Sequence, residues 1–190
     1  SGARVAALDR SAPSDLPGGA RGFGADVTDE ASIAEAFVAV ASEMGTPWGL
    51  IHTVGMWDGG PLAETELSVW RQVMDLNLTS AFLCVREAVR RMDAGRIVAI
   101  ASRQGADRAP EQQAAYAASK AGVVRLVEAT AAEHGSISTV AVAPSMILFG
   151  GEEPGTAGVT AEAVADLCVR LCGDAGPVHT GATLRAYGDG

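Results

Sequence analysis

Short apolar segments alternate with longer helical patterns along this chain, and the alternation limits the folds that it can adopt. The segments expected to be strands are residues 4–8, 50–54, 97–101, 137–143 and 183–187. The helical patterns cover residues 29–44, 67–92, 113–134 and 161–172. Strands that are apolar on both faces belong to parallel sheets that helices cover on both sides. The sequence therefore predicts an α/β fold, a Rossmann-like doubly wound parallel sheet, in a single domain over residues 1–190.

The glycines do not form the phosphate-binding turn with which a dinucleotide-binding fold opens. Such a fold begins with a strand, a glycine-rich turn and a helix whose N-terminus holds a pyrophosphate. Here residues 1–4 resemble the end of that helix, and the glycines between residues 18 and 24 lie in a segment expected to be a loop. We therefore expect the first strand–turn–helix unit, roughly 30 residues, to be lacking from this sequence, so that the domain is N-terminally incomplete or naturally truncated.

Composition narrows the functional classes. Hydrophobic residues make up 48% of the chain and charged residues 19%, which favours a packed globular domain over disorder. A formal charge of -9 without a basic stripe disfavours nucleic acid, and no apolar run indicates a membrane span or a signal peptide. The three cysteines have no metal-ligand spacing, so no metal site is expected and the thiols are expected to be buried in a reducing cytoplasm.

The segment from Tyr116 to Lys120 gives the strongest indication of chemistry. Residues four apart on a helix share a face, so the phenol and the ammonium group are expected to be neighbours. A free tyrosine has a pKa of about 10, and a nearby ammonium group lowers that pKa toward the working range of an acid–base catalyst. A Tyr and a Lys at this spacing also occur by chance on exposed helices, so the pair needs support from its surroundings.

Two further polar residues lie where such a site needs them. Ser102 closes the predicted strand 97–101, and a hydroxyl at the carboxyl end of a parallel strand faces the ligand crevice, where it can hydrogen-bond a developing oxyanion. Asn77 falls inside a helical pattern although asparagine is a poor helix former, which marks a kink or a functional position. Taken alone, Ser102 would be better explained as the cap of a loop.

With these residues in this order, the chain resembles the classical short-chain dehydrogenase/reductase family over nearly its whole length. The resemblance implies a catalytic tetrad of Asn77, Ser102, Tyr116 and Lys120. It also implies cofactor contacts from both halves of the chain, namely Asp9, Asp26, Val27, Thr53, Val54, Gly55, Tyr116, Lys120, Pro144 and Ile147. Within the family, the C-terminal part is similar to dihydropteridine-reductase-like members, and a 3-oxoacyl-reductase-like member is the other candidate.

The chain departs from the family pattern in three places. Where the family has Asn-Asn-Ala-Gly, this chain has residues 52–55, His-Thr-Val-Gly, in which only the glycine remains, and this suggests a close approach of the backbone to the cofactor. A lone histidine at a strand end is usually structural, and His52 is expected to be so. Pro144 is followed by Ser145, where the family has glycine. The segment 148–158 is far shorter than the segment that usually forms the substrate lid in the family.

The family mechanism implies that Tyr116 exchanges a proton with the substrate oxygen while hydride passes between the nicotinamide and the substrate carbon. Lys120 would hold the nicotinamide ribose and lower the tyrosine pKa, Ser102 would orient the oxygen, and Asn77 would hold a water in a proton relay. A carboxylate at Asp9 binds ribose hydroxyls and repels a 2′-phosphate, so NAD is favoured over NADP, a preference that the neighbouring arginine could soften.

The sequence therefore predicts a cytoplasmic NAD(P)-dependent oxidoreductase that interconverts a small-molecule carbonyl and an alcohol. The resemblance implies a homodimer or homotetramer. The composition predicts no nucleic-acid or membrane partner. The first alternative is a catalytically idle member of the same fold that serves as a binding or scaffold protein, which the altered segment 52–55 and the missing glycine-rich unit favour. A second alternative, an epimerase or dehydratase for nucleotide sugars, needs a larger C-terminal domain and is disfavoured.

Overall fold

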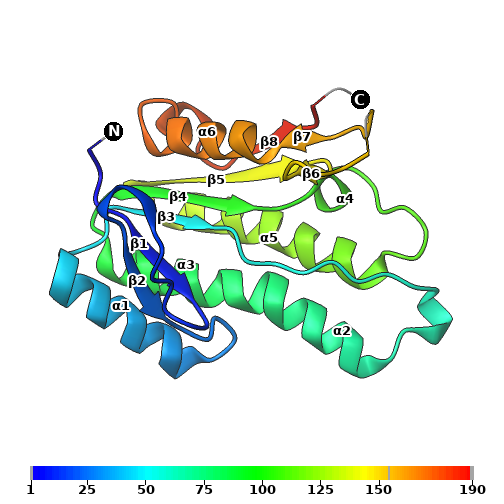
Figure 1. Cartoon of the computed structure of the whole chain (residues 1–190), viewed down its shortest axis with the longest axis horizontal. Coiled ribbons are helices and arrows are strands. Elements are labelled where there is room, and N and C mark those ends of the chain that lie inside the picture. Colours follow the sequence, from blue (N-terminus) through cyan, green and yellow to red (C-terminus); the bar gives the residue numbers. More distant parts are fainter. Residues whose placement is uncertain (1, 154, 189–190) are drawn as a thin grey trace.

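A four-stranded parallel sheet forms the centre of the computed structural model, which describes residues 2–153 and 155–188. Its strands, in spatial order, are β3 (Gly49–His52), β4 (Gly95–Ile100), β5 (Ile137–Pro144) and β8 (Thr183–Ala186). Every neighbouring pair is parallel. Helices cover both faces, with α6 (Ala161–Cys172) on one side and α3 (Ser80–Arg91) and α5 (Ala114–Glu133) on the other (Figure 1). The α/β fold predicted from the sequence is confirmed.

The residues of β4 and β5 explain why both faces of this sheet are covered. Successive side chains of a strand point to opposite faces. One set packs against α6, and the buried members of that cluster include Val98, Ile100, Val140, Val142, Val164, Cys168 and Leu171. The other set consists of small residues that face α5, in a cluster that includes Ala99, Ala101, Ala141, Ala143, Val123, Val124 and Val127. Alanines on the strands allow α5 to approach the sheet closely, which brings side chains of α5 within reach of the strand ends.

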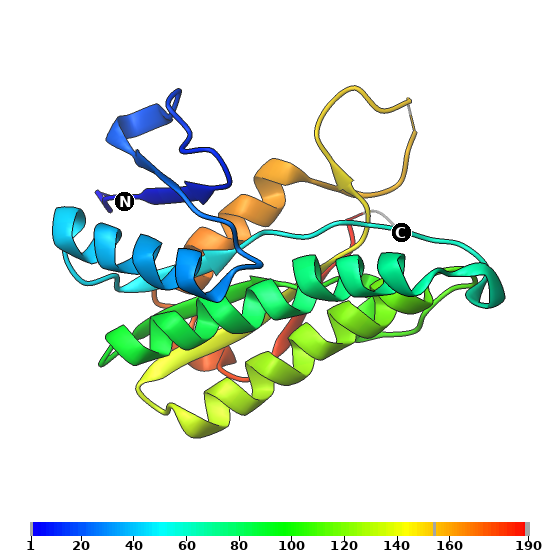
Figure 2. The same cartoon turned by 90° about the horizontal axis from the view of Figure 1, so that it is seen from below.

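A second, two-stranded parallel sheet is formed by β1 (Ala6–Asp9) and β2 (Arg21–Gly24). The prediction that this part of the chain is entirely a loop is wrong for β2. The strand is four residues long and has one apolar side chain, Phe23, which is buried, so it leaves no periodic signal. Position 22 requires a glycine for a steric reason, because a Cβ added at Gly22 would lie 1.9 Å from the carbonyl oxygen of Pro13. Figure 2 shows the pair at one end of the molecule, set off from the four-stranded sheet.

The long helix predicted over residues 67–92 is present but contains one wide turn. α2 (Leu67–Met74) and α3 are joined by a π-helical turn, η3 (Asp75–Thr79), after which the Ser80 N–H donates to the Asp75 carbonyl oxygen, five residues back. Turns of this kind are rare and are found frequently at functional sites. The turn carries Asn77, so the helix is irregular at the residue where the sequence indicates a kink or a functional position, and the irregularity is a wide turn.

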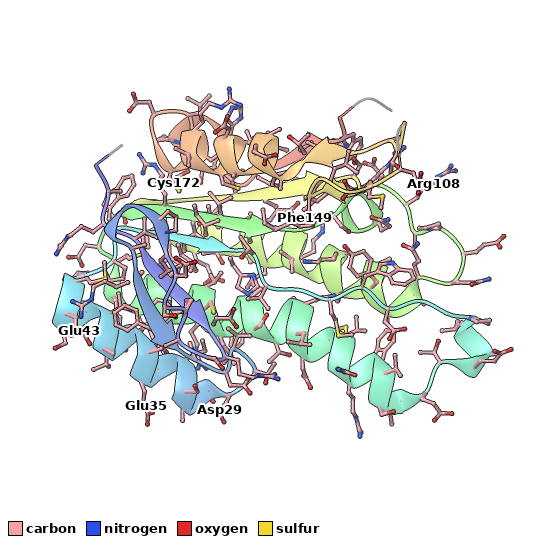
Figure 3. The ribbon with its side chains drawn as sticks, viewed as in Figure 1. Asp29, Glu35, Glu43, Arg108, Phe149 and Cys172 are labelled. Atoms are coloured by element: carbon pink, nitrogen blue, oxygen red, sulfur yellow. The ribbon has the colours of Figure 1, made fainter. Side chains whose placement is uncertain are left out.

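The helix that accompanies the N-terminal strands, α1 (Glu30–Met44), begins after Asp29, which is labelled in Figure 3. The Asp29 carboxylate accepts a hydrogen bond from the Ser32 N–H at 2.7 Å. Several short elements fall where the sequence predicts loops, because they are too short to produce a hydrophobic period. They are η1 (Pro17–Gly19), η2 (Leu62–Glu64), α4 (Arg103–Ala106), β6 (Ile147–Leu148), β7 (Val159–Thr160) and η4 (Pro177–His179). Among the described residues, no helix has the length and apolar character needed to cross a membrane.

Candidate active site

The predicted site residues gather along one edge of the structure, at the carboxyl ends of the strands. Asp9 ends β1, His52 ends β3, and Ser102 follows β4. Tyr116 and Lys120 lie in the first two turns of α5, which begins at the same edge (Figure 1). Ligands of open parallel sheets bind outside the carboxyl ends of the strands. The fold therefore brings these residues to the edge where such a protein binds its ligand.

Asn77 ties three parts of this edge together. Its Oδ1 accepts a hydrogen bond from the Met56 N–H at 2.7 Å, and its Nδ2 donates to the Met56 carbonyl oxygen at 3.0 Å. The same Nδ2 donates to Oγ of Ser119 at 2.9 Å, and that hydroxyl donates to the Tyr116 carbonyl oxygen at 2.7 Å. Asn77 is fully buried. Its amide group therefore joins the wide helical turn to the segment after β3 and to the start of α5.

Lys120 is buried against the end of β4. Its side chain is 4% exposed, and Nζ donates a hydrogen bond to the Ile100 carbonyl oxygen at 2.8 Å. Burial lowers the pKa of this ammonium group to about 8. A Cβ at Gly55 would lie 2.9 Å from Oδ1 of Asn77 and 3.0 Å from Nζ of Lys120. The glycine predicted to let the backbone approach a cofactor thus lets it approach the side chains of Asn77 and Lys120.

Ser102 and Tyr116 come from the loop after β4 and from the first turn of α5. Ser102 is buried at the start of α4, where its Oγ accepts a hydrogen bond from the Gly105 N–H at 3.2 Å. Burial raises the pKa of the Tyr116 phenol, and the neighbouring Ser102 side chain lowers that pKa by less. The expectation that Lys120 lowers the pKa of Tyr116 is therefore wrong for this structure. The physical reason is that the phenol is largely desolvated while the ammonium group is bonded to a backbone carbonyl.

Two predicted cofactor residues meet at the carboxyl ends of β1 and β2. Oδ1 of Asp9 accepts a hydrogen bond from the Arg10 N–H at 2.6 Å. Oδ1 of Asp26 accepts bonds from the N–H and the hydroxyl of Thr28, at 2.9 Å and 2.6 Å, and these bonds lower the pKa of Asp26. The guanidinium group of Arg10 lies 3.9 Å from the carboxylate of Asp26. This corner therefore holds two carboxylates and one cation that is directed to the second of them.

The other predicted cofactor residues differ in what their side chains can reach. Thr53 and Val54 follow β3, the first exposed and the second half-buried, and Pro144 is the buried last residue of β5. Val27 packs against the apolar cluster beneath α1, and Ile147 packs against the cluster beneath α6. The side chains of Val27 and Ile147 are thus used in packing, and for these two residues the backbone is the part left for a ligand.

Two polar residues of this edge were missed by sequence reasoning. Ser119 belongs to the hydrogen-bond network of Asn77, and its only signal is its place directly before Lys120. Gln113 precedes α5, three residues before Tyr116, and its Oε1 is buried without a hydrogen-bond partner in the described part of the chain. A residue at that spacing lies on the same helix face as Tyr116, which is the signal that could have identified Gln113.

Comparison with known proteins identifies the family. The family model described as short chain dehydrogenase matches residues 1–152 of the chain. The chain belongs to this family. The family predicted from Asn77, Ser102, Tyr116 and Lys120 is thereby confirmed.

Three curated relatives of this chain carry the word dehydrogenase in their names, one of them as an inactive protein. It is 37% identical over 142 residues to the inactive 2-(S)-hydroxypropyl-CoM dehydrogenase 2 of Xanthobacter autotrophicus, covering 70% of this chain and 61% of the relative. It is 35% identical over 161 residues to the D-threitol dehydrogenase of Mycolicibacterium smegmatis, covering 77% and 62%. It is 34% identical over 151 residues to the cis-4-hydroxycyclohexanecarboxylate dehydrogenase of Sinomonas cyclohexanicum, covering 76% and 59%. The chain spans about three fifths of the length of these relatives.

Proposed function

We propose that this short-chain dehydrogenase is an oxidoreductase that interconverts a small-molecule carbonyl and its alcohol with NAD(H), and that Tyr116 exchanges the proton. The observation that carries the proposal is the burial of Lys120, the only lysine of the chain, one helical turn beyond Tyr116. A Tyr and a Lys that share an exposed helix face by chance would leave the ammonium group in water. Burial of a charged group without a counter-ion is costly, and such groups concentrate at functional sites.

The residues at the two ends of the edge fit a nicotinamide dinucleotide. An ammonium group has three donors, and Lys120 uses one of them on Ile100, which leaves donors for the ribose next to the nicotinamide. Asp9 uses Oδ1 on a backbone N–H, which leaves Oδ2 for the hydroxyls of the adenosine ribose. A carboxylate there repels a 2′-phosphate, and Arg10, which could offset that repulsion, is directed to Asp26. These contacts favour NAD over NADP.

The protein's own groups would handle the proton and the substrate oxygen. The bound nicotinamide supplies the hydride in reduction and accepts it in oxidation. Tyr116 donates its phenol proton to the substrate oxygen in reduction, and the Ser102 hydroxyl, which influences the pKa of the phenol, orients that oxygen. A phenol keeps its proton at neutral pH even at its ordinary pKa of about 10. Burial raises the pKa of Tyr116 further, which suits proton donation in the reductive direction. Asn77 fixes the segment at Met56 and the start of α5.

A hydroxylated carbon compound of small size is the proposed substrate class. Three relatives are named as dehydrogenases of a hydroxypropyl compound, of threitol and of a hydroxycyclohexanecarboxylate, the first of them as an inactive protein. The proposed assembly is a homodimer or homotetramer. One feature that supports it is the outer face of α3, where Phe82 is 43% exposed and the Arg86 guanidinium lies 5.1 Å from its ring centroid.

A second candidate is a catalytically idle member of the family that binds a dinucleotide or a partner without turnover. One observation favours it, since a relative at 37% identity is named inactive. The raised pKa of Tyr116 is also compatible with a site that does not turn over. The intact set of Asn77, Ser102, Tyr116 and Lys120 is the argument for the enzyme.

Titration of NADH and then NADPH into the full chain, read by nicotinamide fluorescence, separates these candidates. The oxidoreductase proposal expects saturable binding with NADH preferred, followed by NAD-dependent oxidation of at least one member of a panel of small secondary alcohols that includes threitol. Saturable binding with no turnover across the panel and its matching ketones would favour the idle candidate. Absence of binding for both cofactors would overturn the proposal.

A further inference from the structure

His52, a buried histidine at the end of β3, makes a hydrogen bond with Ser80, and the other bond of the serine hydroxyl determines which side chain is the donor. Nε2 of His52 lies 3.2 Å from Oγ of Ser80, and both side chains are buried. The Ser80 hydroxyl donates its hydrogen to the Leu76 carbonyl oxygen at 2.6 Å. A hydroxyl has a single hydrogen to donate, so the bond between the two side chains is donated by His52. The histidine therefore carries its proton on Nε2.

The Ser80 hydroxyl acts on the wide helical turn that carries Asn77. In a regular α-helix, the Leu76 carbonyl oxygen would accept from the Ser80 N–H. In this structure that N–H donates to Asp75, and the hydroxyl of the same serine supplies a donor to Leu76. The side chain of Ser80 thus stabilises the π turn, and His52 holds that side chain in place.

The segment from His52 to Met56 is fastened to this turn at both of its ends. His52 is bound through Ser80, and both backbone groups of Met56 are bound to the amide of Asn77. Between the two attachments lies Gly55, which has no room for a Cβ because of Asn77 and Lys120. Because both ends of the segment are attached to one turn, the distance between the Gly55 backbone and the ammonium group of Lys120 is fixed.

The imidazole is suited to holding a position rather than to moving protons. Burial lowers the pKa of His52 to about 4, and the charge of Lys120, the charged group that faces it, contributes to the lowering. Its Nδ1 is buried and has no hydrogen-bond partner among the described residues. A neutral ring beside Lys120 also adds no charge that would repel the ammonium group.

We propose that His52 is a positioning residue, which together with Asn77 clamps the segment 52–56 onto the π turn and so holds the Gly55 backbone against Lys120. What the clamp contributes to turnover rests on the proposed function, whereas the clamp itself does not. The segment 52–56 is the place where this chain departs from the family's Asn-Asn-Ala-Gly pattern. In this chain the bond between His52 and Ser80, which lie 28 residues apart, fastens the first residue of that segment.

Amide hydrogen exchange, followed by mass spectrometry on the full chain, tests the clamp without reference to activity. His52→Leu removes the donor, Ser80→Ala removes its acceptor, and His52→Gln retains an N–H at a similar distance from the backbone. Thr130→Val is the matched control, because the Thr130 hydroxyl also donates to the carbonyl four residues back, that of Leu126, at 2.8 Å.

We expect exchange in peptides covering residues 53–56 and 75–80 to accelerate roughly tenfold in His52→Leu and in Ser80→Ala, the equivalent of one hydrogen bond. His52→Gln should restore most of the protection, and Thr130→Val should leave these peptides unchanged. Wild-type exchange in both His52→Leu and Ser80→Ala would overturn the inference. Should His52→Leu fail to fold, Ser80→Ala decides the question by the same measurement.

The second readout is kcat for NADH-dependent reduction, measured with and without Asn77→Ala. His52→Leu should lower kcat by about tenfold in the wild-type background and by little in the Asn77→Ala background, where the other end of the clamp is already lost. Thr130→Val should have the same effect in both backgrounds. Additive effects of His52→Leu and Asn77→Ala would count against the clamp. A wild-type chain without turnover would remove the proposed function, and hydrogen exchange would still decide on the clamp.

Discussion

Nζ of Lys120 donates a hydrogen bond to the carbonyl oxygen of Ile100 at 2.8 Å, at the last residue of β4. The lysine side chain therefore spans from the helix that carries Tyr116 to the strand that leads into Ser102. It does so at 4% exposure, which means that the charge has lost nearly all contact with water. One backbone carbonyl is a weak replacement for a hydration shell, and the lowered pKa of Lys120 is the consequence.

Replacing Lys120 by Met is expected to stabilise the protein at neutral pH. The pKa of Lys120 falls from its ordinary value of 10.5 to about 8 on folding, which corresponds to about 3 kcal/mol. Below pH 8 both states carry the proton and the folded state bears the desolvation cost. Between pH 8 and 10.5 the folded state releases its proton first, so the cost fades as the pH rises.

The check is urea denaturation of both proteins at several pH values. The gain in the free energy of unfolding of Lys120→Met over the wild type should be largest below pH 8 and vanish toward pH 10.5. Arg125→Met, on the same helix with an exposed side chain, is the control and should show no such pH dependence. A difference for Lys120→Met that stays constant over this range would contradict the assignment of the cost to a buried charge.

Tyr116→Phe is expected to fold normally and to lose turnover by roughly a thousandfold, the scale of a missing general acid. The loss follows because the phenyl ring fills the same space but has no proton to exchange. The other tyrosine of the chain, Tyr187, donates to the carboxylate of Asp107 at 2.5 Å, so Tyr187→Phe is a matched control that should keep its activity. Steady-state kinetics with NADH and thermal melting decide the result, and equal kcat values for the two variants would sink the mechanism.

Gly55→Ala is expected to destabilise the protein by about 1–3 kcal/mol, the usual cost of forcing a methyl group into a packed site. The new Cβ would lie 2.9 Å from Oδ1 of Asn77 and 3.0 Å from Nζ of Lys120. Gly60→Ala is the control, since a Cβ there meets nothing within 4 Å. Chemical denaturation measures both, and a Gly55→Ala variant as stable as Gly60→Ala would show that this contact is slack in solution.

Asp9→Asn is expected to weaken NADH binding and to improve NADPH binding, moving the ratio of the two dissociation constants by an order of magnitude. The amide keeps a hydrogen-bond acceptor but removes the charge that repels a 2′-phosphate. Asp166→Asn on α6 changes the net charge equally at an exposed position and should leave the ratio unchanged. Fluorescence titration with both cofactors provides the measurement. An unaltered ratio in Asp9→Asn would place the adenosine ribose elsewhere.

The parts of the fold that could be predicted from the sequence are those that leave a local pattern of apolar residues along the chain. The continuous apolar runs of β4 and β5 indicate strands buried on both faces, and the helix period identifies α1, α3, α5 and α6. β2 is not predicted because it is short and because its Gly22 is required by the nearby backbone of Pro13, a contact that no local pattern reveals.

The residues of the candidate site could be selected from the sequence, but the direction in which the pKa of Tyr116 is shifted could not. Tyr116 and Lys120 share a helix, and their spacing is visible in the sequence. Whether an ammonium group lowers the pKa of the phenol depends on how deeply each is buried and on which atom the ammonium group contacts, here the Ile100 carbonyl. The bond between His52 and Ser80 joins residues 28 apart and exists only once β3 packs against α3.

The N-terminal strand pair packs against the rest of the structure through the apolar cluster beneath α1. Asp9 and Asp26 stand at the carboxyl ends of this pair, while Tyr116 and Lys120 stand on a helix that packs against the main sheet. The cluster joins α1, through the buried Phe37, to residues of α3 and β4. Repacking at Phe37 would thus alter the span between the two pairs of polar residues that is offered to a long ligand. The affinity for such a ligand would change while the chemistry of a short substrate stayed the same.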